Sequence, residues 1–277
     1  AAYTLTVNST STGKSENITV PIESSAGYVA GLINTNATSL GVEASAITRV
    51  KFPPPKKNGD ISFTLKSKPG INNSATISAS VLSTDLTNLA NTINNYSGRT
   101  GVTANLSSDK KHIILENKNG DDIDISSFSG PDTLTTNTTA LGASAGTTIT
   151  HNSHGLSTGD KVIYTAGGTA LNNLTSGQTY YAIKVNDNTF RLANSASNAS
   201  GGTALTIGGA GGSATDKFTP PFSLEVLKSD FTSFSTPVSI DIDGNSYKAA
   251  KLSGELQIES SSAITTSNDG GTTTVTG

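Results

Sequence analysis

The sequence predicts an α+β fold dominated by β-strands, and three observations lead to this expectation. Alternating apolar and polar residues recur along most of the chain, which is typical of strands with one buried face. Helical spacing of apolar residues is confined to short segments. The pattern also repeats at an offset of 60 residues. We therefore expect two ββαββ repeat units, an inserted all-β module and a returning set of C-terminal strands.

The internal repeat aligns matching residues in one register. The matched pairs are Tyr3-Thr4-Leu5 with Phe63-Thr64-Leu65, Ala30 with Ala90, Ile33-Asn34 with Ile93-Asn94, and Gly41-Val42-x-Ala44 with Gly101-Val102-x-Ala104. Several matches in one register indicate a duplicated structural unit. We assign the first unit to residues 1–60 and the second to residues 61–130.

Each unit begins with two predicted strands, at residues 3–8 and 17–22 in the first and 61–66 and 74–81 in the second. A short helix follows, and in the second unit Ser83-Thr84-Asp85 offers an N-cap. Its apolar face must cover a sheet; this face comprises Leu86, Leu89, Ala90 and Ile93. A glycine turn and two more strands complete each unit, with strands in the second unit at 102–106, 112–116 and, after Asn119-Gly120, 123–128.

The periodicity changes in the segment assigned to the inserted module, residues 133–219, where we expect short strands and no helix. Predicted strands lie at 161–165, 179–185 and 189–193, and Pro220-Pro221 closes the module. The Ser, Thr, Asn and Gly-rich stretches 130–150 and 194–214 are interpreted as surface loops. Residues 220–277 are expected to pack back on the repeats, with strands at 223–227, 238–242, 246–248 and 255–259.

Composition narrows the functional classes. The 277 residues include no Cys, Met or Trp, only 14% are charged, and the net charge is -3. Disulfides and thiol chemistry are excluded, and the scattered cations argue against a nucleic-acid groove. No apolar run of about 20 residues predicts a membrane span, and no signal peptide is evident. Because the chain opens at Ala1, we expect it to follow a processed segment or to lie inside a longer product.

Two resemblances suggest where such a chain works. Residues 85–94 with 99–104, 113–115 and 119–123 resemble the flagellin hook IN motif, named for the pair Ile93-Asn94. The ending 254–264 is similar to a strand that often follows this motif. Residues 154–162, 174–181 and 188–193 look like a module of phage tail and fibre proteins. Together these resemblances imply a structural protein of a tailed-phage virion.

The alternative is the outer variable domain of a flagellin or hook-associated protein, although the heptad-patterned terminal helices of flagellins are missing here. A tail-associated glycan hydrolase is the third reading, but no carboxylate pair is singled out. We expect a non-enzymatic chain at a virion or appendage surface, with no cofactor. Its expected partners are further copies, other virion or filament subunits, or a host-surface glycan or protein, and not nucleic acid or membrane.

Few residues point to a specific site. Asp241, Asp243 and Asn245 form a fragment of a calcium loop, and Asp121, Asp122 and Asp124 form an acidic cluster. Neither has the full alternating ligand set with a terminal Glu, and turns explain both without an ion. His151 and His154 could share a metal, yet a third ligand is missing. Amphipathic rings suit sugars, so an aromatic patch is a further candidate, formed by Tyr164, Tyr180 and Tyr181. The alternative is that strand alternation buries one of the neighbouring tyrosines and exposes the other.

Overall fold

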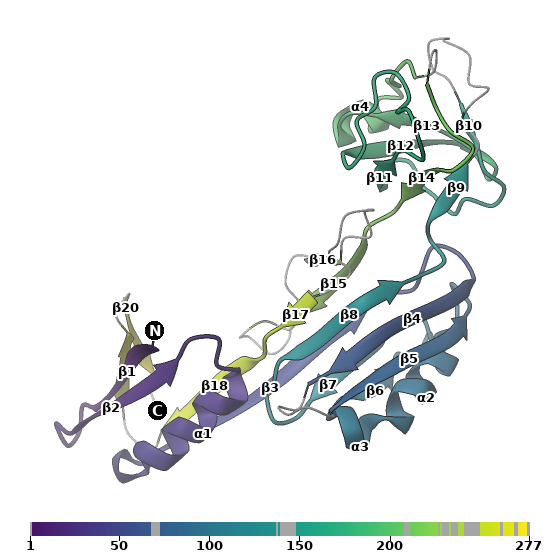
Figure 1. Ribbon diagram of the computed structural model, residues 1–277. Coiled ribbons are helices and arrows are strands. Elements are labelled where there is room, and N and C mark those ends of the chain that lie inside the picture. Colours follow the sequence, from purple (N-terminus) through teal and green to yellow (C-terminus); the bar gives the residue numbers. More distant parts are fainter. Residues whose placement is uncertain are drawn as a thin grey trace.

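The protein is an elongated row of three packed bodies (Figure 1). The computed structural model describes residues 2–67, 73–136, 138, 148–207, 211–226, 228, 233, 238–240, 250–260, 263–268 and 271–275. Strands fill four sheets and the helices are few and short, which confirms the predicted α+β, β-dominated class. Each body has its own cluster of buried apolar side chains. We call the bodies the first module, the second module and the insert.

The first module combines both extremes of the described chain. Its elements are β1 (Ala2–Ser9), β2 (Ser15–Pro21), α1 (Ala26–Asn36), the 3-10 helix η1 (Thr38–Leu40), the first half of β3 (Val42–Phe52), β18 (Glu255–Ser260), β19 (Ile264–Asn268) and β20 (Gly271–Val275). One sheet has the order β2-β1-β19-β20, and β18 pairs with β3. Helix α1 begins at the Ser25 cap, whose hydroxyl accepts the N–H of Tyr28 at 3.2 Å.

The second module is built around two facing sheets. Its elements are the second half of β3, β4 (Gly59–Lys66), β5 (Ser74–Val81), α2 (Thr87–Asn95), α3 (Ser97–Thr100), β6 (Thr103–Leu106), β7 (Ile113–Asn117), β8 (Ile123–Ser129), β15 (Phe222–Val226), β16 (Val238–Ile240) and β17 (Ala250–Leu252). The sheet orders are β17-β8-β4-β5 and β16-β15-β3-β7-β6. Aromatic rings join the two sheets: Phe222 lies 4.8 Å from Phe52 and 4.7 Å from Phe128, centroid to centroid.

The 60-residue repeat has a counterpart in hydrogen bonding. The Asn34 side chain donates to the carbonyl of Ala44 and accepts its N–H, both at 2.7 Å. The Asn94 side chain makes the same two bonds with Ala104, at 2.9 and 2.8 Å. In each case one asparagine ties the helix to the strand that follows it. The turn between them contains a glycine with positive φ, Gly41 at 71° and Gly101 at 79°.

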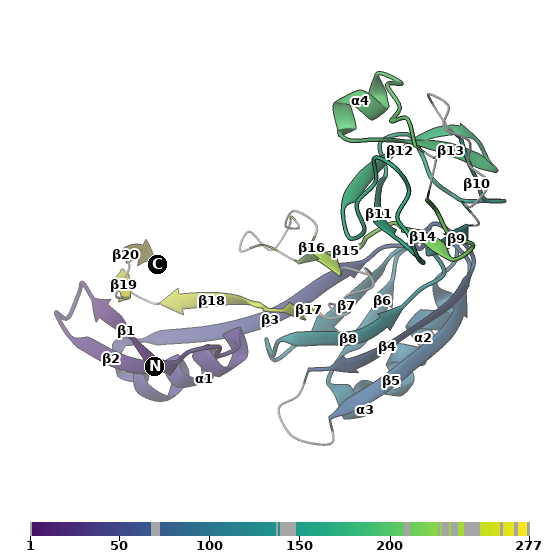
Figure 2. The ribbon, with the colours of Figure 1, turned by 45° about the horizontal axis from the view of Figure 1, so that its top comes forward.

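The expectation that the first unit is a continuous ββαββ segment is wrong. After α1 the chain forms the single long strand β3, whose first half pairs with β18 and whose second half pairs with β7 (Figure 2). The strands that close the first module arrive from the C-terminal region. Ala44 faces Ile258 on β18 as Ala104 faces Leu115 on β7, and β19 pairs with β1 as β8 pairs with β4. The second module is therefore inserted between β3 and β18 of the first.

The insert forms one six-stranded sheet at the far end of the molecule (Figure 1). Its elements are β9 (Leu134–Thr136), β10 (Ile149–Thr150), β11 (Lys161–Thr165), β12 (Thr179–Asn186), β13 (Thr189–Ala193), α4 (Ala196–Ser200) and β14 (Asp216–Thr219), with the sheet order β10-β13-β12-β11-β14-β9. The stretch 194–214 is not purely surface loop, because it includes α4 and because Ile207 packs into the core. The predicted strand at 246–248 lies outside the described residues.

Candidate functional site

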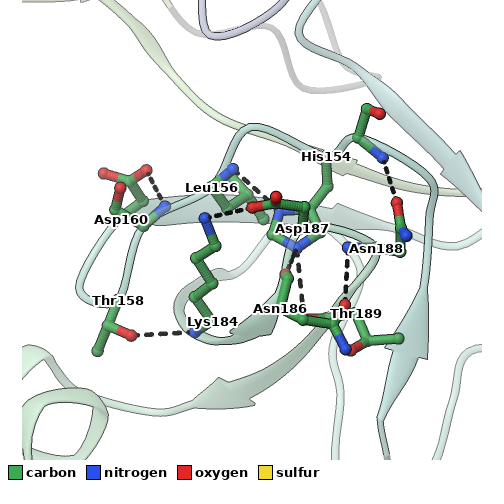
Figure 3. Close-up of polar contacts among 11 residues, drawn as sticks. His154, Leu156, Thr158, Asp160, Lys184, Asn186, Asp187, Asn188 and Thr189 are labelled. Atoms are coloured by element: carbon green, nitrogen blue, oxygen red, sulfur yellow. Dashed lines mark hydrogen bonds and ion pairs between the residues drawn. The ribbon is translucent and has the colours of Figure 1, made fainter.

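A network of hydrogen bonds joins the loop at residues 153–160 of the insert to the turn between β12 and β13 (Figure 3). His154 is fully buried beside Phe190, with ring centroids 5.2 Å apart. Its Nδ1 accepts the N–H of Leu156 at 3.0 Å, so Nε2 carries the proton and donates to the carbonyl of Asn186 at 2.8 Å. Both ring nitrogens are therefore used in fixing two loops. A metal shared by His151 and His154, which the sequence only suggested, would require these bonds to break.

The same network sets the exposed rim of the insert. The ammonium group of Lys184 lies 2.7 Å from the Asp187 carboxylate, and the backbone N–H of Lys184 donates to the Thr158 hydroxyl at 3.0 Å. The Asp187 pKa is lowered, first by the hydrogen bond from Lys184 and then by its charge. The Asn188 side chain accepts the N–H of Ser153 at 3.0 Å. These contacts join the loop at residues 153–158 to the exposed turn between β12 and β13.

The insert is also fastened to the second module. The carboxylate of Asp132 accepts the backbone N–H groups of Lys56 and Lys57 at 2.8 and 3.1 Å, and the Lys56 ammonium pairs with Asp160 at 3.2 Å. At Gly155, which has φ 69°, a Cβ would lie 2.7 Å from the carbonyl oxygen of Lys56, so only glycine fits. Beside this junction is a groove of about 480 Å³, lined by Lys56, Lys57, Asn58, Ser83, Ser153, Gly155 and Asp187.

The structure does not bring the three candidate tyrosines together as an exposed patch. Tyr164 is fully buried, and its hydroxyl donates to Asp216 at 3.2 Å and accepts the N–H of Leu171 at 3.0 Å. Burial raises the Tyr164 pKa to about 12. Tyr180 is also buried, with its hydroxyl accepting the N–H of Thr175 at 2.8 Å, whereas Tyr181 is half-buried. Strand alternation, the alternative interpretation, accounts for the neighbouring pair.

The acidic cluster lies in a second groove, of about 330 Å³, between the first and second modules. Asp122 is buried and pairs with Lys251 at 3.0 Å. Burial raises the Asp124 pKa, and the charge of nearby Lys251 opposes this effect. Two exposed apolar side chains, Ile22 and Tyr28, line the same groove. Sequence reasoning missed both, although an aromatic residue on the polar face of a short helix could have drawn attention to Tyr28.

Metal ligation has no support within the described ranges, where no three His, Cys, Asp or Glu side chains converge. The calcium-loop candidates Asp241, Asp243 and Asn245 lie outside those ranges. Among the helices that the structure describes, none has the length and apolarity needed to cross a membrane.

Comparison with known proteins adds little to this geometry. No protein-family model and no curated protein matches the chain. The crystal structure of the flagellar cap protein FliD from Helicobacter pylori is similar over 98% of this chain and 82% of that chain, with 10% sequence identity and a TM-score of 0.23. A TM-score this low does not establish a shared fold.

Proposed function

We propose that the chain is a non-enzymatic structural region of a tailed-phage virion protein, exposed on a tail, fibre or capsid, that holds its insert outward for assembly or host attachment. One observation supports this most directly. The strands nearest the two ends of the sequence, β1 and β20, lie in one sheet of the first module, and the insert lies at the opposite end of the molecule (Figure 1). If the rest of the assembly joins the chain at the first module, the insert lies far from that attachment point.

The contacts at the junction suit such a role. Asp132, Lys56 and Gly155 fix the insert to the second module through backbone hydrogen bonds and close packing. Within the insert, His154 and Lys184 fix the exposed turns. A surface that is already ordered loses less conformational entropy when a partner binds it. The resemblance of the insert sequence to phage tail modules favours a virion over other assemblies.

The proposal is tested by electron microscopy of the native assembly with site-specific gold labels. Because the chain has no Cys, a single engineered thiol is a unique label within it. Val185→Cys places the label on the insert, where Val185 is 48% exposed, and the matched control Lys14→Cys places it on the β1–β2 hairpin of the first module. We expect gold at residue 185 to lie farther from the body of the assembly than gold at residue 14. Equal or reversed distances would contradict the proposal.

The flagellar alternative is supported by the asparagine pair Asn34 and Asn94, because the same bonds recur where the IN motif resemblance lies. The same micrographs separate the two readings. A tail, fibre or capsid carrying the label supports the virion proposal, whereas a helical filament with coiled-coil ends supports an outer flagellin domain. Turnover of a surface polysaccharide, abolished by replacing one carboxylate, would contradict the non-enzymatic part.

A further inference from the structure

Among the described strands, β18 has a single ladder partner. Within the described ranges it pairs with β3, with Ile258 facing Ala44 and Leu256 facing Ala46, and no described strand pairs with its other edge. Figure 2 shows β18 lying along the first half of β3. Unpaired edges expose backbone groups that another strand can bind.

In the second module, the equivalent strand β7 has partners on both sides. Leu115 on β7 lies between Ala104 of β6 and Val50 of β3. Its counterpart on β18 is Ile258, which faces Ala44, and no described residue takes the place of Val50. The second module thus receives a strand from the module before it. The first module has the same position beside β18, and no described strand occupies it.

The side chains of β7 and β18 differ in burial in the way that the missing partner strand predicts. Ile113 and Leu115 on β7 are both 0% exposed. Their counterparts Leu256 and Ile258 are only half-buried against the core of the first module. Burying the remaining apolar surface of these side chains would be favourable. Leu256 and Ile258 therefore keep exposed apolar surface that an added strand could bury.

The acidic residues of β18 and β3 also favour an added strand. Glu259 on β18 is directly opposite Glu43 on β3, and both are exposed. The Glu259 carboxylate accepts a hydrogen bond from the Gln257 side chain at 3.0 Å, but neither glutamate forms an ion pair among the described residues. Like charges at opposite positions of a sheet are destabilising. In the second module the counterpart Glu116 is paired instead with Arg49, at 2.6 Å between Nε and Oε2. A cation on the next strand would relieve the acidic pair in the same way.

We infer that the outer edge of β18, at Leu256 to Glu259, binds an extended segment of a neighbouring subunit as an added antiparallel strand. The second half of β3 supplies the expected pattern: a cation opposite Glu259, as Arg49 faces Glu116, and apolar residues opposite Ile258 and Leu256, as Val50 and Phe52 face their partners. Main-chain hydrogen bonds provide affinity in this mode of recognition, and alternate side chains provide specificity.

The test uses a synthetic peptide with the sequence of residues 47–53, Ile-Thr-Arg-Val-Lys-Phe-Pro, added to the full chain. Hydrogen exchange should slow at residues 256–259, and fluorescence anisotropy should report binding. Glu259→Arg should weaken binding about fivefold, the size expected for an exposed ion pair worth up to about 1 kcal/mol. A peptide with Glu in place of the residue corresponding to Arg49 should recover binding to this variant and bind the unaltered chain poorly.

Glu16→Arg is the matched control, because Glu16 lies on the sheet-edge strand β2 and the change in net charge is the same. Absence of protection at 256–259, protection elsewhere, or equal weakening by both substitutions would overturn the inference. A thermal melt of each variant establishes that it is folded. The inference rests on the proposed function only in naming the partner as another subunit of the assembly. Failure of the peptide experiment leaves the gold-label result unchanged, and the reverse also holds.

Discussion

Asn94 shows how a single side chain joins two elements. It makes two hydrogen bonds to Ala104, and each net bond is worth about 0.5–1.5 kcal/mol. We expect Asn94→Ala to lower the free energy of unfolding by about 1–3 kcal/mol, measured by urea denaturation. The neighbouring variant Asn95→Ala is the control, because Asn95 is exposed on the same helix, and it should change stability by less than about 0.5 kcal/mol. Equal losses would show that the bonds to Ala104 contribute nothing.

Asp132 predicts a pH dependence that belongs to one carboxyl group. Burial raises its pKa above the ordinary 3.8, although the N–H groups of Lys56 and Lys57 act in the opposite direction. The folded state therefore holds the proton more tightly than the unfolded state, so this group's contribution to stability is present below pH 3.8 and is lost as the pH rises through the raised pKa.

Asp132→Asn removes the titration but keeps an oxygen that can accept the N–H groups of Lys56 and Lys57. Relative to this variant, the unaltered chain should lose stability between about pH 3.8 and the raised pKa, measured as the difference in Tm between the two proteins across pH 3.5–7. A constant difference would contradict the assignment of burial as the dominant cause.

At the scale of elements, local patterns were sufficient to predict most strands. Alternation located β5, β11 and β13, and the repeat located the two modules' helices. Strand β3 escaped prediction because the same alternation runs through residues 42–52, and only pairing with distant strands divides it between modules. Alternation along β12 correctly indicated that one of Tyr180 and Tyr181 is buried. It could not indicate that Tyr164 and Tyr180 satisfy their hydroxyls inside the core, because those partners come from loops at 171 and 175 and from β14.

The insert provides a prediction at the same scale. Strands β9 and β14, which lead into and out of it, are paired neighbours, with Leu134 facing Phe218. A short connection can therefore replace the module. We expect a chain with residues 133–219 replaced by a Gly-Ser linker to keep the other two cores, seen as unchanged amide protection in β4, β5 and α2. Global loss of protection would show that the insert is needed for the rest to fold.

At the scale of the whole molecule, the three bodies are nested along the chain. The first module is opened after β3 to admit the second, which is itself opened after β8 to admit the insert. Each opening falls between strands that remain close in space, so the outer module closes around the inner one. This arrangement requires contacts between residues far apart in the sequence, because β1 pairs with β19 across more than half of the chain. Such long-range pairing is expected to form late in folding.

This nesting predicts that truncation acts selectively. Removing residues 255–277 deletes β18, β19 and β20, which cover the first module, but leaves β15 and β17 in the second. Val7, Ile33 and Leu40, buried in the intact chain, would then lose a large part of their cover. We expect hydrogen exchange to show loss of protection in β1, β2 and α1, with protection retained in β4, β5 and α2. If both modules unfold together, the second half of β3 depends on the first half, and the modules form one cooperative unit. If neither unfolds, β18 and β19 are dispensable, and the equivalence of these strands with β7 and β8 does not extend to stability.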